Sequence, residues 1–500
     1  MFSRLPFTVS IRIAALLLAP VAAGCTLAVG EPEVCDADLQ CVSGFGFGSV
    51  CQSDGYCSAP PEIPARCGRT FPDGLLDQPA EFADHIIIGS LFSYEAHNDT
   101  LQAAELAVRQ VNQNGGLEGR RFGIVHCDYE AEAGDNLDDI EAVEMLAPYL
   151  AETLGTPVIV GPRGSSRTEA TFNAVRDLDT VVISPSATSP ALTALDGGSG
   201  SDSSPGLLWR TAPPDSLQSR VIASTMLDSG VENVAVIFQQ GAYGDALAAL
   251  FQADFLENGG GNVESYPFEA GNDFSTSVAT VSTGIIAGDI DEVLFISSDG
   301  ADYVSFLLSA TATGTLRTAF TETLGTEDRG LFFADAAYSA DMIDATVGNA
   351  EALFGKIRGT RPAPAEGALF DAFAAAYVST YVEDSTGSAY TPHSYDAAWM
   401  SIYGIAWATF NESEVNGTTV ARGLRKMSAG TDYDITPTTW TSVINEFRSG
   451  SSVNVRGASG SLDYDSTTEE TTAPIETWIV VANEDEESGY GFERAALTQP

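Results

Sequence analysis

The sequence is poor in basic residues, and lysine is almost absent. Only Lys356 and Lys426 occur, and the 500 residues carry 23 basic against 69 acidic side chains, a net charge of −46. A chain that neutralises nucleic-acid phosphates needs a basic surface, so a nucleic-acid partner is not expected. The acidic excess indicates a soluble, self-repelling surface or, alternatively, one that attracts cationic ligands.

The sequence also lacks the common catalytic motifs. It contains no G-x-S-x-G elbow, no H-E-x-x-H pair and no P-loop, and its four histidines are scattered at His85, His97, His126 and His393. We therefore expect neither an enzyme nor a cofactor. An exported α/β hydrolase is the catalytic alternative, and it would need a histidine within about 3 Å of Ser165 or Ser186.

The N-terminus has an apolar run too short to span a bilayer stably. Arg4 and Arg12 precede the apolar segment 13–19, and small residues lead to Cys25. This pattern is typical of a signal peptide over residues 1–24. It resembles the lipobox of bacterial lipoproteins, although Ala22 stands where that family usually has leucine. The resemblance implies a lipid on Cys25, and the alternative is ordinary secretion with cleavage elsewhere.

Seven cysteines occur, and lipidation of Cys25 would leave six for three disulfides in an oxidising compartment. Residues 35–66 combine a cysteine-rich module with a proline-rich linker. The module reads C-x5-C-x9-C-x5-C, and it has no C-x-x-C pair to favour a metal site. We interpret it as a stapled stalk or as a docking unit. Its four cysteines, whose connectivity the sequence leaves open, are Cys35, Cys41, Cys51 and Cys57.

Two further cysteines flank the beginning of the large domain. Cys67 precedes its first expected strand and Cys127 ends its second. We expect a disulfide between these two cysteines. It would attach the N-terminal segment to the first of the two lobes that we expect in this domain.

Continuous apolar runs alternate with amphipathic helical stretches through most of the chain. Strands buried on both faces and separated by helices indicate parallel sheets with crossover helices, so the fold class is α/β. The expected strand cores are residues 85–89, 122–125, 158–160, 181–183, 234–237, 293–296 and 331–333.

Two hydroxyl-rich loops follow neighbouring strands of this pattern. Ser165 and Ser166 come after the strand 158–160, and Ser186 and Thr188 come after the strand 181–183. Ligands of open α/β sheets bind beyond the carboxyl ends of strands, where helix N-termini favour anions. These loops are typical of a carboxylate site, although a serine at such a position also commonly caps a helix.

Taken together, the motifs resemble those of type I periplasmic solute-binding proteins, the branched-chain amino-acid-binding and receptor ligand-binding family. The features that carry the resemblance are Gly161-Pro162 with Ser165-Ser166, residues 184–190, residues 210–215, Tyr243-Gly244 and residues 395–397.

The resemblance implies roles for individual residues. Hydroxyls of Ser165, Ser186 and Thr188 would hold a ligand carboxylate, and Tyr243 would cover the ligand from the second lobe. Asp335 or Asp299 would pair with an ammonium group. If Ala336 occupies the family's acidic position, however, the ammonium group would have no acidic partner, which points to a different ligand.

The resemblance also implies two Rossmann-like lobes joined by a hinge within residues 67–482. We expect the first lobe at about 83–205 and 340–427, the second at about 206–339 and 428–482, and an acidic tail at 483–500. The expected function is capture of a small polar ligand, such as an amino acid, for a membrane permease of an ABC transporter. The alternative is a surface sensor. The chain would lie in the periplasm or on the cell surface, held to a membrane by its lipid anchor.

Overall fold

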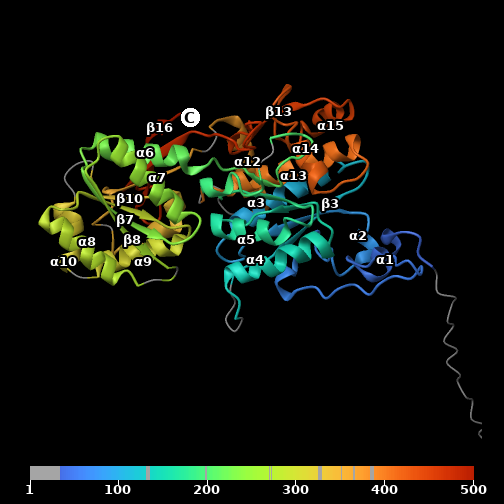
Figure 1. Cartoon of the computed structure of the whole chain (residues 1–500), viewed down its shortest axis with the longest axis horizontal. Helices are drawn as coiled ribbons and strands as arrows, with labels where there is room; N and C mark the ends of the chain where they lie inside the picture. The colour runs from blue at the N-terminus through green and yellow to red at the C-terminus, as the bar shows by residue number, and fades with distance from the viewer. Residues whose placement is uncertain are drawn as a thin grey trace, which may run out of the picture.

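The computed structural model describes residues 34–130, 136–197, 200–269, 271, 273–312, 314–324, 329–350, 352–363, 366–382 and 388–500. They form two lobes, each built around its own sheet, with a small N-terminal module attached to the first lobe (Figure 1). Cys25 and the expected signal peptide lie outside the described residues. Within those residues, no helix is both long enough and apolar enough to cross a membrane.

The first lobe contains a six-stranded sheet in the order β1-β3-β2-β4-β5-β6. Its strands are parallel except β1, which pairs antiparallel with β3. The inner strands consist of buried, mostly β-branched residues, as expected for a sheet covered on both faces. The strands are β1 (Arg69–Phe71), β2 (Ile86–Leu91), β3 (Phe122–Cys127), β4 (Val158–Val160), β5 (Val181–Ser184) and β6 (Leu208–Arg210).

Helices far apart in sequence cover this sheet. The long helix α13 (Thr391–Asn411) is buried along most of its length and packs against α3 (Asn98–Gln113) in one apolar core. The lobe's other helices are α2 (Pro79–Phe82), α4 (Asp139–Pro148) with η2 (Tyr149–Thr153), α5 (Ser165–Val175), η3 (Pro190–Leu192), α12 (Ala368–Tyr381), α14 (Gly417–Leu424) and α15 (Trp440–Arg448).

The second lobe contains a seven-stranded sheet in the order β16-β15-β11-β10-β9-β7-β8. Its strands are β7 (Asn233–Gln239), β8 (Asn262–Phe268), β9 (Glu292–Ile296), β10 (Leu331–Phe333), β11 (Ile357–Pro362), β15 (Ile475–Ala482) and β16 (Tyr490–Thr498). The five strands from β8 to β11 are parallel, whereas β15 and β16 are antiparallel to their neighbours. The parallel α/β class expected from the apolar runs is thus confirmed in both lobes.

Within the described residues, six helices and two short helical turns belong to the second lobe. They are α6 (Asp215–Asp228), α7 (Gly244–Glu257), α8 (Ser275–Ala287), α9 (Gly300–Thr311), α10 (Gly314–Thr318), η4 (Ala319–Thr323), η5 (Asp335–Ala337) and α11 (Ala340–Thr346). The chain passes between the lobes between β6 and α6, between β11 and α12, and between β14 (Gly460–Ser461) and β15.

The observed lobe boundaries differ from the expected ones in the C-terminal third. Residues 340–362 were expected in the first lobe, but β11 pairs with β10 and β15 in the second sheet. Residues 428–464 were expected in the second lobe, but β12 (Thr431–Asp434), β13 (Val453–Gly457) and β14 form a small sheet on the first. The carboxylate of Asp396 in α13 holds this sheet because it accepts hydrogen bonds from the amides of Ala458 and Ser459, at 2.9 and 2.7 Å.

The expected acidic tail is also a structural element. β16 forms the edge strand of the second sheet by pairing antiparallel with β15. Much of β16 is exposed, but its main chain completes the ladder next to a buried strand. The acidic run at 484–487 lies before β16, and the expectation of a tail missed the pairing of this strand.

The N-terminal module is stapled by two disulfides, Cys35–Cys51 and Cys41–Cys57. It contains the short helix α1 (Asp38–Phe45) and is followed by η1 (Ala65–Cys67). A third disulfide joins Cys67 to Cys127, the pairing expected from their positions around the first strands. Both of these sulfurs are buried, so this bond ties the linker directly to the core of the first lobe.

Removal of this third disulfide should destabilise the first lobe. The bond closes a segment with a sequence separation of 60 residues, and its loss should lower the free energy of unfolding by about 3 to 4 kcal/mol on the chain-entropy estimate. Urea unfolding of a C67S/C127S variant measures the effect. As a control, C35S/C51S should disturb the module and leave the unfolding midpoint of the lobes in place. Equal midpoints for wild type and C67S/C127S would contradict the expectation.

Candidate functional site

The loops that follow the parallel strands of both sheets meet between the lobes. They line a small inner pocket that opens into a larger outer cavity. The wall of the inner pocket is formed by Arg163, Gly164, Ser165 and Ser186 from the first lobe, by Tyr243, Ser298, Asp335 and Ala336 from the second, and by Tyr390 at the start of α13. The pocket thus lies at the carboxyl ends of strands, where an α/β fold gathers its ligand-binding loops.

The side of the pocket formed by the first lobe carries hydroxyl groups that can donate hydrogen bonds. The Ser186 Oγ accepts a hydrogen bond from the amide of Gly164 and the Ser165 Oγ accepts one from the amide of Ser189, both at 3.1 Å. Because a hydroxyl can also donate once, both serines keep their protons available for a group in the pocket. Gly164 has a φ of 82°, a conformation that favours glycine, and it directs the chain into α5.

The opposite wall is centred on the buried carboxylate of Asp335, which is 3% exposed. It accepts short hydrogen bonds from the hydroxyls of Tyr243 and Tyr390, and a third from the Gln218 Nε2 at 3.2 Å. Burial, and then the charge of Asp335, raise the pKa of both tyrosines well above its usual range. Both hydroxyls therefore stay protonated and act as donors to this carboxylate.

A second buried acid, Asp215, lies behind the pocket at the start of α6. Neither of its carboxyl oxygens has a hydrogen-bond partner among the described groups. Burial, followed by the charge of Asp335, raises the pKa of Asp215 well above its usual range. Burial beside Asp335 therefore favours the protonated form of Asp215, which avoids two buried negative charges side by side.

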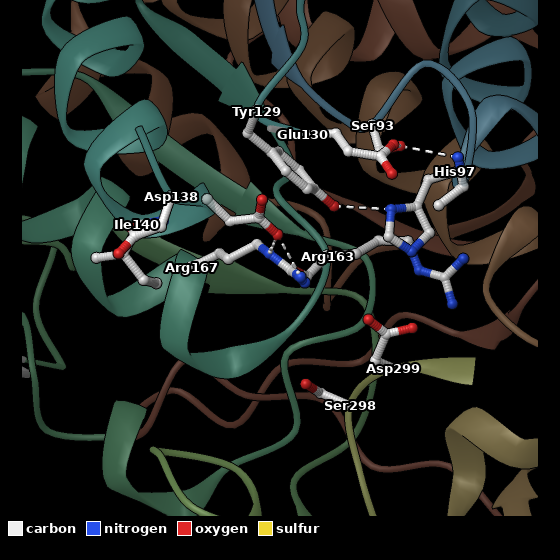
Figure 2. A network of polar contacts seen from close by, with 12 residues as sticks. Ser93, His97, Tyr129, Glu130, Asp138, Ile140, Arg163, Arg167, Ser298 and Asp299 are labelled. Carbon is white, nitrogen blue, oxygen red and sulfur yellow. Dashed lines mark hydrogen bonds and ion pairs between the residues drawn. The ribbon is translucent and has the colours of Figure 1, made fainter. Parts of the chain in front are cut away.

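An outer cavity continues from the inner pocket and shares Arg163, Ser298, Asp335 and Tyr390 with it. Figure 2 shows its mouth, where Arg163 extends toward His97 and Asp299 lies on the other side. The neighbouring Arg167 is paired with Asp139 at 2.7 Å.

The polar network in Figure 2 fixes the state of His97. The Tyr129 hydroxyl lies 2.8 Å from its Nδ1. Burial, with the nearby charges of Arg163 and Arg167, lowers the pKa of His97 well below its usual range. The imidazole is therefore neutral at the mouth of the cavity.

Four of the seven residues expected to bind ligand line the inner pocket: Ser165, Ser186, Tyr243 and Asp335. Ala336 lines it too, but the neighbouring carboxylate of Asp335 faces the same space. The inner pocket therefore contains an acidic side chain, whose presence the sequence had left open.

The other three expected residues have different positions. The Ser166 Oγ accepts a hydrogen bond from the Ala242 amide of the opposite lobe, at 3.1 Å. Thr188 is buried outside the pocket lining, and its carbonyl accepts from the Asp215 amide. Asp299 is exposed at the outer cavity, where it caps α9 by accepting from the Ala301 amide.

Sequence reasoning missed Tyr390, Arg163 and Ser298. Tyr390 reaches the pocket only because α13 returns to the first lobe, which no local pattern indicates. Arg163 was within the glycine-rich loop already singled out, and its charge in a lysine-poor chain was the signal that could have found it. Ser298 follows β9 directly, and the carboxyl end of that strand could have indicated it.

The fold and this interlobe site define a ligand-binding protein of the type I periplasmic class. Residues 99–473 match the receptor family ligand binding region, and the chain belongs to that family.

Two curated relatives illustrate the family. The chain is 27% identical over 391 residues to the chemotactic signal transduction system substrate-binding protein BasB of Halobacterium salinarum, covering 77% of this chain and 82% of that protein. It is 31% identical over 179 residues to the Leu/Ile/Val-binding protein of Escherichia coli K12. That match covers 35% of this chain and 44% of the relative, less than half of its length.

Solved structures share the fold at low sequence identity. A leucine-binding protein LivK from Thermotoga maritima has a TM-score of 0.60 at 16% identity, covering 83% of this chain and 99% of that chain. A solute-binding protein of an ABC transporter from R. palustris, in complex with 4-hydroxybenzoate, has a TM-score of 0.63 at 13% identity, covering 83% and 98%.

The buried acid behind the pocket predicts a pH effect on stability. Asp215 binds its proton more tightly in the folded state than in the unfolded state, so unfolding releases a proton above pH about 4. The free energy of unfolding should therefore fall as pH rises above that value, by at most about 1.4 kcal/mol per pH unit for one group. An Asp215→Asn variant should have a flatter slope in urea titrations between pH 4.5 and 6.5.

The matched control is Asp289→Asn, which changes an exposed aspartate of the same lobe and should keep the wild-type slope. An unchanged slope in the Asp215→Asn variant would show that Asp215 is ionised in the folded protein.

Proposed function

We propose that this chain captures an α-amino acid, or a closely related carboxylate, between its two lobes. The observation that carries the proposal is the division of the inner pocket into a donor wall and an acceptor wall. Ser165 and Ser186 present hydroxyl protons on one side, and the Asp335 carboxylate lies on the other. A zwitterion has the complementary pattern, since its carboxylate accepts and its ammonium donates.

The donor wall suits a carboxylate for a second reason. Ser165 begins α5, so amides at the helix N-terminus lie beside the two hydroxyls. The positive end of a helix stabilises a negative charge. The ligand carboxylate would therefore bind to the hydroxyls and helix amides of the first lobe.

The acceptor wall suits an ammonium group. Asp335 is buried, so a ligand lacking a cation would leave its charge without an ionic partner once water is expelled. This consideration favours an amino acid over a simple aromatic acid, such as the benzoates bound by some proteins of the same fold.

Contacts across the cleft support a closing mechanism. The Ser189 Oγ donates to the Ala242 carbonyl at 2.6 Å, and the Ala242 amide donates to the Ser166 Oγ. These hydrogen bonds join the lobes beside the pocket. A ligand that touches both walls would favour this closed arrangement by the free energy of the contacts it makes only there.

Removal of the two donor hydroxyls should weaken binding. Each charge-assisted hydrogen bond contributes about 1.5 to 3 kcal/mol, so S165A/S186A, which lacks two of them, should lose affinity by about a hundredfold or more. Calorimetry with L-leucine, L-isoleucine, L-valine, L-glutamate, L-aspartate, L-glutamine and L-asparagine measures the effect, with wild type binding at least one of them.

The control is Ser401→Ala, whose buried hydroxyl bonds the Ala397 carbonyl within α13 and is not part of the pocket wall. It should bind as wild type does. Absence of binding by wild type across the whole panel would refute the proposal, and so would equal affinities for wild type and S165A/S186A.

The membrane partner would receive either the ligand or a signal. Delivery to a permease of an ABC transporter fits the amino-acid-binding relatives, whereas the name of BasB favours a chemotactic signalling role. The same closed, ligand-loaded form would serve both. Identification of the membrane protein that this form binds would separate transport from sensing.

The membrane attachment is proposed to be a lipid on Cys25. Export followed by acylation would hold the lobes near a membrane through residues 26–66. A Cys25→Ala variant should move from the membrane fraction to the soluble fraction, and it should lose labelling by a fatty-acid analogue while keeping ligand affinity. Membrane association and labelling that persist in this variant would contradict the anchor.

A further inference from the structure

The inner pocket has a second charged residue in its wall. Arg163 follows β4 and reaches the boundary between the inner pocket and the outer cavity, so it lies beside the same space as Asp335. Its guanidinium lies over the ring of Tyr390 at 5.4 Å from the ring centre. Tyr390 in turn donates its hydroxyl to Asp335, so one ring lies between the two opposite charges.

Arg163 forms no ion pair with a carboxylate of the described residues, although the chain has three times as many acidic as basic side chains. The adjacent Arg167 is paired with Asp139. Two aspartates of the outer cavity have other contacts, because Asp299 caps α9 and Asp99 accepts from the Thr391 hydroxyl at 2.7 Å. The Arg163 guanidinium beside the pocket can therefore pair with an anionic group of a ligand.

His97 lies beside this cation as a neutral imidazole. Its Nδ1 is 2.8 Å from the Tyr129 hydroxyl, and burial, with the charges of Arg163 and Arg167, lowers the pKa of His97 well below its usual range. Figure 2 shows the imidazole next to the Arg163 guanidinium. The guanidinium is a planar fork of N–H donors, which matches an anionic oxygen group.

We infer that the ligand carries a second anionic group, which Arg163 binds as the specificity-determining residue, and that the ligand class is acidic α-amino acids. The inference rests on the proposed function, which places the α-carboxylate at Ser165 and Ser186 and the ammonium at Asp335. A ligand with a branched aliphatic side chain would instead exclude water from the Arg163 guanidinium when the lobes close. It would leave that charge without a partner.

The test compares pairs of amino acids that differ only in whether the side chain ends in a carboxylate or in an amide. Calorimetry on the full chain with L-glutamate against L-glutamine, and with L-aspartate against L-asparagine, should give a preference for one acid over its amide on the order of 10- to 100-fold. Arg163→Met should abolish that preference, and Arg163→Lys should retain part of it because the charge stays without the planar fork.

The control variant is Arg176→Met, which removes an exposed arginine that stacks on Phe172 at the end of α5. It should keep the full preference. Thermal unfolding together with retained amide binding by Arg163→Met would show that the variant folds.

The outcomes separate this inference from the proposed function. Equal binding of acid and amide by wild type would overturn the role of Arg163 and leave amino-acid capture standing. A preference that survives in Arg163→Met would overturn the role of Arg163 as well. Absence of binding by every amino acid would overturn both.

Discussion

The arrangement of the site depends on the hydrogen bonds that the Asp335 carboxylate accepts from both lobes. This carboxylate lies just beyond β10 of the second lobe, yet it accepts from Tyr390, which begins the main helix of the first lobe, as well as from Tyr243 and Gln218 of its own lobe. A buried charge needs several donors to offset its desolvation. Meeting that need draws the returning segment and the second lobe together. The charge of Asp335, after burial, also raises the pKa of Asp215 behind the pocket.

Local sequence patterns predicted those elements that depend mainly on residues close together in the chain, namely individual strands and the loop before a helix. The apolar runs indicated the parallel strands β2, β4, β5, β7, β9 and β10, and glycine with hydroxyl residues indicated the loop before α5. The failures concern pairing at long range. The alternation of strands and helices says nothing about which sheet a later segment joins, so β11 and residues 428–464 were expected in the wrong lobe. The edge strand β16 was expected to belong to an acidic tail because the acidic run 484–487 precedes it, and its pairing with β15 has no local sequence signal.

The candidate site divides in the same way. Ser165, Ser186, Tyr243 and Asp335 lie within five residues of the carboxyl ends of strands, where the fold gathers ligand-binding groups, and these four line the inner pocket. Ser166 adjoins Ser165, but its hydroxyl contacts the opposite lobe. Asp299 adjoins Ser298 of the pocket wall but is exposed. Tyr390 could not be found without the return of α13, since its function depends on a contact between residues 55 positions apart.

The chain's large negative charge and the composition of its pocket have different consequences. A net charge of −46 repels an anionic ligand at long range, but salt screens that field over about 10 Å. Inside the closed cleft, screening is weak and the nearest groups dominate. There Arg163 and Asp335 offset each other, and neutral hydroxyls and helix amides supply the remaining donors. Ligand selection is therefore decided by a few buried groups, while the acidic surface governs solubility and the rate of encounter.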